Sequence, residues 1–406
     1  MSAARNAGNG QRAASRKSAT ELAAKFERIA LVLQGGGALG AYQCGVYEAL
    51  HEAGIRPNWF AGTSIGAINA AIIAGNAEQD RVDRLHAFWD QITGHGAVTA
   101  WPLDALSLWA AWLPPSDVLS SGLAATSALG SLGFGQHGFF SPRSTSPLLL
   151  TDGSPQATSF YDAGPLRQTL ERLVDFDRIN HGDVRLSVGA ANVISGNVRY
   201  FDFAIEALRV EHIMASAALP PAFPAIEIEG EAWWDGGIVS NTPLEHVLVA
   251  TPRLDSLVLQ VDLWSARGHA PKTIMDVLER QKDIQYSSRT RYGTDTVARE
   301  QKLRNALGQL IDSLPDGTLP AKLEADLQPW LCDRVFNIIH LIYQAKHHEE
   351  QYKDHAFGAT AMREHWKGGL ADMQHTLNKP EFFALPSRDL GVVTHDIHRI
   401  LKSNKA

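Results

Sequence analysis

Short apolar runs that end in glycine or in a turn recur along most of the chain. Residues 29–33 (Ile-Ala-Leu-Val-Leu) lead into a glycine cluster, and residues 58–61 (Asn-Trp-Phe-Ala) lead into a second glycine motif. Unbroken runs of this length are typical of strands buried on both faces of a sheet. Residues 257–263 form another such run, which we predict as the last strand of the core. Residues 184–188 and 198–203 predict two strands joined around a Gly-Asn turn.

A helical stretch follows each of the first two strands. Residues 41–53 are closed by Gly54, and residues 65–74, rich in alanine and isoleucine, are closed by Gly75. Glycine directly after a helical segment is a stop signal. Two consecutive units of strand, glycine turn and helix indicate an α/β fold with a parallel sheet. Both glycine turns then lie at the carboxyl ends of strands, where such sheets place their functional sites.

The pattern becomes mainly helical toward the C-terminus. Before the last core strand, residues 161–176 predict a helix with leucines on one face. Beyond the core, residues 272–314 carry charges of both signs and predict helices, residues 335–343 resemble a strand, and residues 350–377 predict a further helix. We therefore expect a mainly helical extension over residues 266–406, whose role the sequence does not indicate.

Composition narrows the class of protein. The 406 residues are enough to bury an α/β core and an additional region, and the 45% of hydrophobic residues is typical of a globular protein. A run of about eighteen uninterrupted apolar residues, the length that spans a membrane, does not occur. The net charge of -7 gives no reason to expect a nucleic acid partner. Cys44 and Cys332 are the only cysteines, which fits a reducing, cytoplasmic compartment.

The N-terminal residues have a different composition from the rest. The first twenty residues are rich in Ala, Ser, Asn and Gly and carry four basic residues, Arg5, Arg12, Arg16 and Lys17. They lack the apolar segment of a secretory signal, so we expect a disordered basic tail over residues 1–27. Basic segments gain roughly 1 kcal/mol per charge near an anionic membrane, which leaves peripheral membrane contact open.

The second glycine motif carries the most specific chemistry. It reads Gly-Thr-Ser-Ile-Gly and has the Gly-x-Ser-x-Gly pattern of a nucleophile elbow, in which a serine is held on a tight turn between a strand and a helix. Glycines on either side let the two backbones come close, so the hydroxyl projects. This predicts Ser64 as the nucleophile of an acyl transfer reaction. The other elbow residues are Gly62, Thr63, Ile65 and Gly66.

The upstream glycine cluster can supply backbone N–H groups to an oxyanion. The same cluster matches the dinucleotide-binding pattern Gly-x-Gly-x-x-Gly, which requires an acidic residue at the end of the second strand. That strand ends in Phe60-Ala61-Gly62, so the oxyanion interpretation is favoured. The candidate oxyanion residues are Gly35, Gly36, Gly37, Ala38, Leu39 and Gly40.

A serine hydroxyl needs a base to become a nucleophile. Asp235 follows two tryptophans and precedes Gly236 and Gly237, which suggests a strand end and a tight turn that exposes its carboxylate. Apolar surroundings raise the proton affinity of a carboxylate toward that required of a base. An ordinary Asp-Gly-Gly hairpin turn is the structural alternative. His181 and His246 lack a comparable context, and we expect both to be surface or capping residues.

The three motifs, in this order, resemble the patatin-like phospholipases, a family of serine acyl hydrolases. Residues 215–224, shortly before Asp235, resemble the family's connecting segment. The resemblance covers residues 28–265 and implies a three-layer α/β/α catalytic domain with a mostly parallel sheet. It also implies hydrolysis of lipid esters by a Ser–Asp dyad, with Ser64 as nucleophile, Asp235 as base and the glycine cluster as oxyanion hole. Neither a metal nor another cofactor is implied, and the extension resembles one found in bacterial members.

One residue departs from the family pattern. Many members carry arginine at the position of Leu39. Backbone amides can still hold the oxyanion, but a contact to substrate charge, and with it a preference for phospholipids, comes into doubt. Three alternatives stay open: a Ser-His-Asp triad esterase, an acyltransferase, and a lipid-binding protein without catalysis. Head group, acyl length, regioselectivity and oligomeric state are not predicted.

Two further regions have two interpretations each. Residues 94–160 interrupt the α/β pattern and are either a mobile apolar lid over the site or a packed insertion. Adjacent histidines on a helix point in different directions, so His347, His348 and His355 indicate a solvated face in preference to a metal site. The large apolar residues of the insertion are Trp101, Leu103, Leu106, Leu108, Trp109, Trp112, Leu113, Phe134, Phe139 and Phe140.

Overall fold

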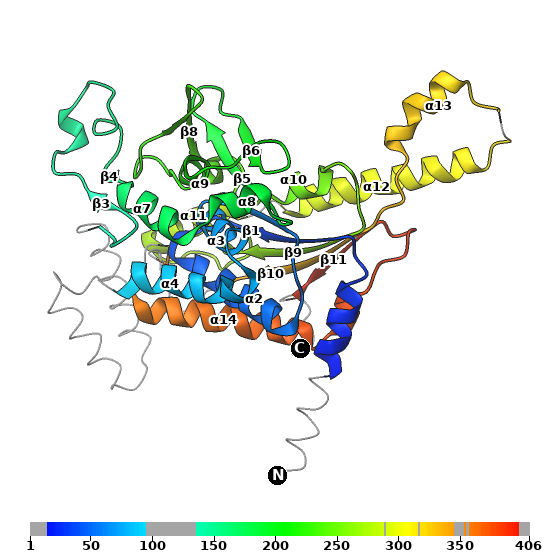
Figure 1. Ribbon diagram of the computed structural model, residues 1–406, viewed down its shortest axis with the longest axis horizontal. Helices are drawn as coiled ribbons and strands as arrows, with labels where there is room; N and C mark the ends of the chain where they lie inside the picture. Colours follow the sequence, from blue (N-terminus) through cyan, green and yellow to red (C-terminus); the bar gives the residue numbers. More distant parts are fainter. Residues whose placement is uncertain are drawn as a thin grey trace, which may run out of the picture.

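A single large sheet runs through the centre of the molecule, with helices on both of its faces (Figure 1). The computed structural model describes residues 14–94, 135–287, 290–315, 317–344, 353–354 and 357–397. Within these residues the sheet has nine strands in the order β11-β10-β9-β1-β2-β5-β8-β7, and β6 pairs with β5. The strands are β1 (Arg28–Leu33), β2 (Trp59–Thr63), β5 (Arg185–Asn192), β6 (Val198–Asp202), β7 (Ile226–Ile228), β8 (Glu231–Asp235), β9 (Ser256–Asp262), β10 (Phe336–Ile342) and β11 (Val392–Asp396).

The pairing directions divide the sheet into a parallel and an antiparallel part. From β11 through β10, β9, β1 and β2 to β5, successive strands pair parallel, whereas β6 and β8 pair antiparallel with β5, and β7 pairs antiparallel with β8. A short ladder of β3 (Ser141–Pro142) and β4 (Tyr161–Asp162) lies apart from this sheet. The predicted α/β fold with a mostly parallel sheet is confirmed.

Helices cover the sheet from both sides. They are α2 (Ala41–Ala53), α3 (Ile65–Ala74), α4 (Arg81–Gly94), α7 (Gly164–Leu173), α8 (Phe176–His181), α9 (Val210–Ser216), α10 (Leu244–Val249), α11 (Ile274–Tyr286), α12 (Thr290–Asp312), α13 (Ala321–Leu327) and α14 (Ala359–Leu377). Short 3-10 turns are η1 (Gly37–Gly40), η2 (Glu78–Asp80), η3 (Pro147–Leu149), η4 (Gly236–Ile238), η5 (Gln328–Trp330) and η6 (Pro380–Phe383). Within the described ranges, every helix is too short or too polar to cross a lipid bilayer.

The alternating side chains of β1 show why the fold has three layers. Leu31 and Leu33 belong to one buried cluster with residues of α2, α3 and α4, whereas Ala30 and Val32 belong to a second cluster with residues of α10 and Val297 of α12. Successive side chains of a strand point to opposite faces. An apolar strand such as β1 therefore supplies both core layers at once.

The C-terminal segment adds strands to this same sheet. Strand β10 pairs parallel with β9, and β11 pairs parallel with β10. The prediction that residues 257–263 form the last strand of the core was therefore wrong. The apolar run at residues 335–343 was visible in the sequence, but an apolar run does not reveal which strand it pairs with.

Helix α14, from the same C-terminal segment, packs directly along α2 (Figure 1). A Cβ atom on Gly45 would lie 1.9 Å from the carbonyl oxygen of Trp366, and one on Gly369 would lie 1.9 Å from that of Tyr42. These glycines let the two helix backbones approach more closely than side chains would permit. The C-terminal segment therefore contributes to the main core, in both the sheet and the helix layer.

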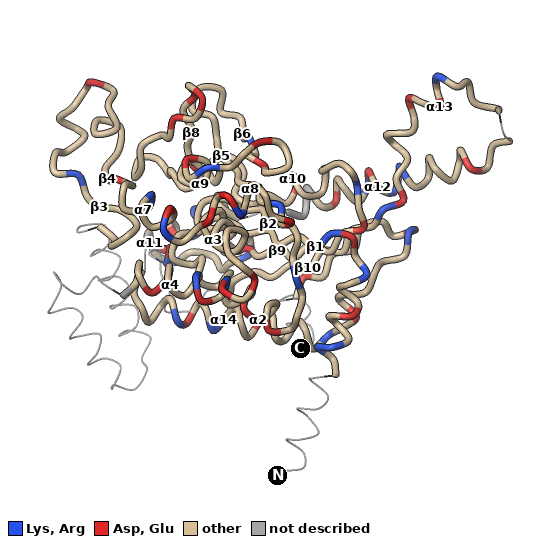
Figure 2. Tube along the Cα trace, in the orientation of Figure 1, with Lys and Arg blue, Asp and Glu red and all other residues tan. Residues whose placement is uncertain are grey.

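Two other predicted segments differ in detail. The helix expected over residues 161–176 is β4 followed by α7 and α8, because Pro165 starts one helix and Asp175 caps the next. The helix expected over residues 350–377 is described from Ala359 onward as α14. Helix α12 carries charges of both signs, as predicted (Figure 2).

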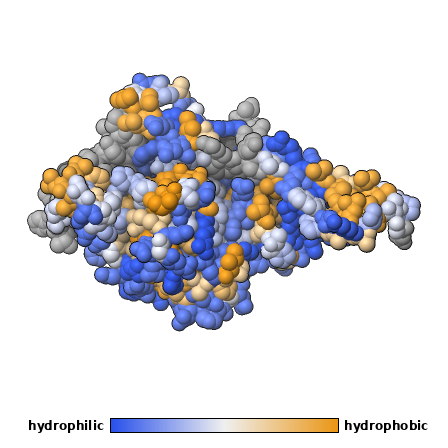
Figure 3. Space-filling model, turned by 90° about the horizontal axis from the view of Figure 1, so that it is seen from above, coloured by the Kyte–Doolittle hydropathy of each residue, from blue (hydrophilic) through white to orange (hydrophobic). Residues whose placement is uncertain are grey.

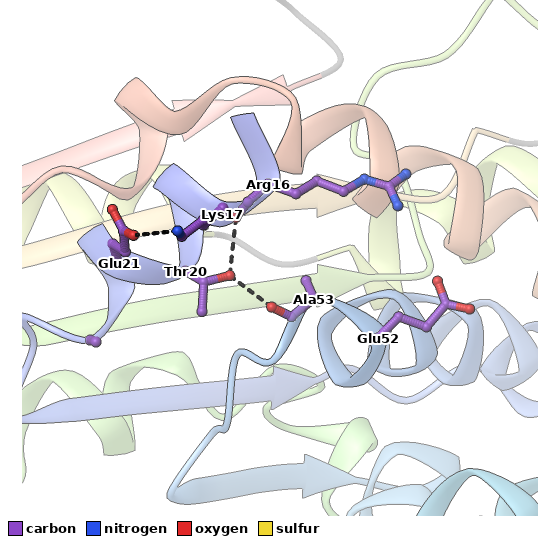
Figure 4. Close-up of a pocket in the computed structure, with 7 residues that line it drawn as sticks. Arg16, Lys17, Thr20, Glu21, Glu52 and Ala53 are labelled. Atoms are coloured by element: carbon purple, nitrogen blue, oxygen red, sulfur yellow. Dashed lines mark hydrogen bonds and ion pairs between the residues drawn. The ribbon is translucent and has the colours of Figure 1, made fainter. Parts of the chain in front are cut away.

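Part of the expected disordered tail is a helix. Residues 14–23 are helical, and Ala19 and Ala23 are buried against the core. The hydroxyl of Thr20 donates to the carbonyl of Ala53 at 2.7 Å, at one side of a surface pocket (Figure 4). Alanine-rich composition suits a helix once a neighbouring surface offers burial, so composition alone was misleading here. Residues 1–13 lie outside the described part.

The described part of the insertion is packed only in places: Leu148 and Leu149 are 82% and 78% exposed, whereas two phenylalanines are not. Phe139 and Phe140 are buried, and both rings contact Phe223 at centroid distances of 6.3 and 5.5 Å. These two residues therefore belong to the core and not to an exposed apolar cap. Residues 95–134 lie outside the described part of the chain. They contain all the large apolar residues named above for the insertion, apart from Phe139 and Phe140.

Candidate active site

Ser64 occupies a sharp turn between β2 and α3. Its backbone has φ 56° and ψ -127°, a left-handed conformation that is uncommon for a residue with a side chain. A Cβ on Gly62 would lie 2.3 Å from the carbonyl oxygen of Gly66, and a Cβ on Gly66 would lie 2.3 Å from that of Leu33. Both flanking glycines are therefore required for the strand and the helix to approach, as the elbow pattern predicts.

A second serine supports this turn. The N–H of Ser64 donates to the carbonyl of Ser216 at 3.1 Å and to its hydroxyl at 3.2 Å. The Ser216 hydroxyl itself donates to the carbonyl of Gly189 at 2.6 Å, on strand β5. Ser216 lies in the segment at residues 215–224 that resembled the family's connecting segment, but its contact with Ser64 could not be predicted from that pattern.

Asp235 meets Ser64 because β8 and β2 both flank β5. Asp235 is the last residue of β8 and lies opposite Ala190 of β5. The Ser64 hydroxyl donates a hydrogen bond to its carboxylate, and the N–H of Gly237 donates a second at 2.7 Å. The carboxylate is 1% exposed. The structure thus brings together two side chains that are far apart in the sequence.

Burial governs the acidity of this carboxylate. Desolvation raises the pKa of Asp235 from 3.8 to about 7, although the hydrogen bonds from Ser64 and Gly237 act in the opposite direction. Both hydrogen-bond donors are uncharged, so the carboxylate has no cationic partner in these contacts. A carboxylate with a pKa near 7 can accept and return a proton near neutral pH.

The glycine turn lies beside the serine. A Cβ on Gly35 would be 2.9 Å from the Cβ of Ser64. The turn begins with Gly36 and continues as η1, with Gly37 at φ 56°. A Cβ on Gly37 would also lie 2.3 Å from the carbonyl oxygen of Asp354, so glycine is required there for two reasons.

Hydrogen bonds already engage the N–H groups of three of the six predicted oxyanion residues, and one of these, that of Leu39, donates to the carbonyl of Gly36 at 3.2 Å. The N–H of Gly35 donates to the carbonyl of Asn241 at 3.2 Å, and the N–H of Ala38 donates to that of Asp354 at 2.9 Å. The N–H groups of Gly36 and Gly37 have no partner among the described residues, as expected for the first donors of a helical turn. They are the available donors of the turn.

The position of Leu39 decides whether this residue can contact a charged substrate, which the sequence left open. Its side chain is fully buried in the core. It therefore offers no contact to a bound substrate, whatever charge that substrate carries.

Asn241 is a site residue that sequence reasoning missed. Its side-chain amide donates to the carbonyl of Gly35 at 3.0 Å and to the carbonyl of Tyr286 at 2.9 Å. Its own carbonyl accepts the N–H of Gly35. Asn241 thereby joins the glycine turn to the end of α11. Its nearness to Asp235 in the sequence was the one available signal.

The two histidines considered as bases are engaged elsewhere. His246 contacts the carboxylate of Asp202 at 2.9 Å and stacks on Tyr200. His181 is exposed, and its Nδ1 lies 2.9 Å from the carbonyl of Asp177. In the described part of the chain, neither forms a hydrogen bond with Ser64 or Asp235.

The residues in the described ranges do not form a metal site. There, no group of three His, Cys, Asp or Glu residues has the arrangement to hold an ion. His347, His348 and His355 lie outside those ranges. Cys44 is buried, as expected for a small apolar side chain.

Comparison with known proteins adds to this geometry. The family model described as patatin-like phospholipase matches residues 31–248, and a model described as patatin phospholipase matches residues 284–389. Lysophospholipase nte1 from Aspergillus terreus (strain NIH 2624 / FGSC A1156) is 54% identical over 50 residues, which are 12% of this chain and 3% of that protein. The chain thus matches only a small part of that relative.

A solved structure also resembles the chain at low similarity. The crystal structure of VipD from Legionella pneumophila has a TM-score of 0.36 and 16% sequence identity. The match covers 87% of this chain and 67% of that one.

Proposed function

The chain belongs to the patatin-like phospholipase family, and on that premise we propose that it hydrolyses carboxylic esters of lipids. Ser64 is the proposed nucleophile, and Asp235 is the proposed base. The N–H groups of Gly36 and Gly37 are the proposed oxyanion hole. The observation that carries the proposal is the hydrogen bond between a serine on a strained turn and a buried carboxylate.

The first half-reaction follows from these positions. As the Ser64 oxygen bonds to the ester carbonyl carbon, its proton passes to Asp235. Negative charge develops on the carbonyl oxygen, where two fixed N–H donors stabilise it. When the intermediate collapses, Asp235 returns the proton to the departing alcohol, and Ser64 keeps the acyl group.

The second half-reaction releases the acid. Water attacks the acyl-serine, Asp235 accepts its proton, and the same N–H groups hold the oxyanion again. The bond to Ser64 then breaks and its oxygen regains a proton from Asp235. An acyltransferase would use an alcohol in place of water at this step, and product analysis distinguishes the two.

Hydrolysis of a short p-nitrophenyl ester tests the proposal. Ser64→Ala should reduce turnover to the background rate, because no other group can form the acyl intermediate. Ser240→Ala is the matched control, since its hydroxyl lies 3.3 Å from that of Tyr200 and outside the proposed machinery. Activity retained by Ser64→Ala, or lost equally in the control, would contradict the assignment.

The substrate and its setting belong to the same proposal. Ile238 and Val239, directly after the dyad turn, are 38% and 56% exposed. Exposed apolar side chains beside a catalytic carboxylate suit an acyl chain or a lipid surface. We therefore propose peripheral contact with membranes, and the two cysteines, both free, support a reducing, cytoplasmic compartment. Flotation with anionic vesicles tests this: failure to co-float would leave only dispersed esters as substrates.

A further inference from the structure

We propose that Lys353, in the C-terminal segment, is a positioning residue that holds the glycine turn in its active geometry. The inference rests on the proposed function of that turn as an oxyanion hole. Lys353 does not touch the reacting atoms. It acts through the two points at which the turn is fixed to the rest of the molecule.

The first fixed point is Gly35. Its carbonyl accepts the indole N–H of Trp264 at 2.8 Å. The ammonium group of Lys353 lies 5.2 Å from the centre of the Trp264 ring, within the range of a cation–π contact. Lys353 therefore packs on the side chain that orients one end of the turn.

The second fixed point is Ala38. Its N–H donates to the backbone carbonyl of Asp354 at 2.9 Å, and Asp354 directly follows Lys353. The same carbonyl faces Gly37, which carries one of the two available N–H groups. A shift of this short segment would therefore move the proposed oxyanion donors.

Ion pairs fix the segment to α11. The Lys353 side chain is 4% exposed, and its ammonium group lies 2.7 Å from Asp283 and 3.2 Å from Glu279. The carboxylate of Asp354 is held by Lys282 at 2.9 Å. Loss of the Lys353 charge would leave Glu279 without this partner and Asp283 with Arg280 at 3.8 Å, which weakens the attachment of the segment to α11.

Helix α11 also supports the other side of the turn. The carbonyl of Tyr286, its last residue, accepts hydrogen bonds from the side chains of Asn241 and Gln34. Asn241 in turn accepts the N–H of Gly35. The same helix therefore connects Lys353 to the site by two routes, and this gives the C-terminal segment a role in catalysis.

The test uses Lys353→Met in the full chain, with p-nitrophenyl butyrate as substrate. Methionine keeps most of the volume and removes the charge. Active sites are counted by complete reaction with a fluorophosphonate, so that kcat is expressed per intact site. We expect kcat to fall about tenfold or more with KM within about twofold, because oxyanion contacts form only in the transition state.

Two further variants make the result decisive. Lys282→Met removes a side chain that is 34% exposed, so it should fold, and it should lower kcat by a smaller factor. Lys379→Met is the control, because that amine lies over the Phe382 ring in the same C-terminal segment. It should leave kcat unchanged.

The outcomes separate this inference from the proposed function. Failure of the wild type to react at Ser64 or to hydrolyse the ester would reject both. An active wild type whose kcat per site is unchanged in Lys353→Met would overturn the positioning role alone. Fewer intact sites with normal kcat would also overturn it, since Lys353 would then serve stability only. Should Lys353→Met not fold, an unchanged kcat in Lys282→Met would overturn it.

Discussion

Replacing Asp235 by asparagine should abolish catalysis and, near neutral pH, make the protein more stable. The carboxyl group is 1% exposed, and burial raises its pKa from 3.8 to about 7. Asparagine has nearly the same shape and carries no charge. Its carbonyl can accept the N–H of Gly237, and its amide can face the Ser64 hydroxyl.

The pKa shift gives the magnitude and the pH window. The unfolded chain releases the Asp235 proton near pH 4, whereas the folded chain keeps it until about pH 7. Between these pH values the folded state binds more protons than the unfolded state, so the free energy of unfolding of the wild type falls as pH rises. Above pH 7 it falls no further. The pKa of Asp235 rises by about 3, and each pH unit is worth about 1.4 kcal/mol, so the free energy of unfolding falls by about 4 kcal/mol in total. The free energy of unfolding of Asp235→Asn should not show this fall, because asparagine does not ionise.

Urea denaturation at pH 4.5 and pH 8 measures the effect. The difference in unfolding free energy between Asp235→Asn and wild type should be small at pH 4.5 and favour the variant at pH 8. Asp202→Asn is the control of opposite sign: burial raises the pKa of Asp202, but hydrogen bonds from His246 and Arg185 outweigh it and hold the pKa below its usual range. That variant should be destabilised at pH 8. If Asp235→Asn were the less stable protein at pH 8, or if its advantage did not change with pH, the reasoning would be refuted.

Three more predictions concern catalysis. The kcat/KM for a neutral ester should rise as pH increases through about 7 and then level off, because Asp235 must be ionised to act as a base; a flat profile from pH 5 to 9 would count against it. Gly37→Ala should lower kcat by about 10²–10³, since the new methyl group collides with the Asp354 carbonyl and displaces the proposed donors, and wild-type turnover would exclude Gly37 from the oxyanion hole. His246→Ala should keep kcat within about threefold per titrated site while lowering Tm, because Asp202 loses a partner; loss of activity comparable to Ser64→Ala would favour a histidine triad.

Local sequence patterns predicted the parts of the site that local geometry determines. A strand, a glycine turn and a helix are consecutive in the chain, so Gly62 and Gly66 mark the turn at Ser64 without knowledge of the rest of the fold. The strand that ends at Asp235 was predicted from a local signal too, the two tryptophans before it and the two glycines after it. Its proximity to Ser64 came from the family resemblance, because antiparallel pairing of β8 with β5 leaves no local signature.

Residues that act across the fold were not predictable in this way. Asn241 and Lys353 are ordinary polar residues in the sequence, and their contacts depend on where α11 lies. Which N–H groups of the glycine turn stay available depends on acceptors from Asn241 and Asp354, which are distant in the chain. The helix at residues 14–23 likewise depends on burial against the core and not on composition.

The exposure of apolar residues on helices was also not predictable from the sequence pattern. Figure 3 shows apolar side chains on the arm that α12 and α13 form, and Leu303, Leu310 and Leu323 there are 70%, 59% and 44% exposed. Helical periodicity predicts which residues share a face, but it does not reveal whether another element covers that face.

A crystal structure of the protein after reaction with a phosphonate ester tests the central claim most directly. The account predicts phosphorus bonded to the Ser64 oxygen, with the phosphonyl oxygen within hydrogen-bond distance of the N–H groups of Gly36 and Gly37 and the Asp235 carboxylate beside the modified serine. Phosphorus on another residue, or a phosphonyl oxygen directed away from the glycine turn, would contradict it.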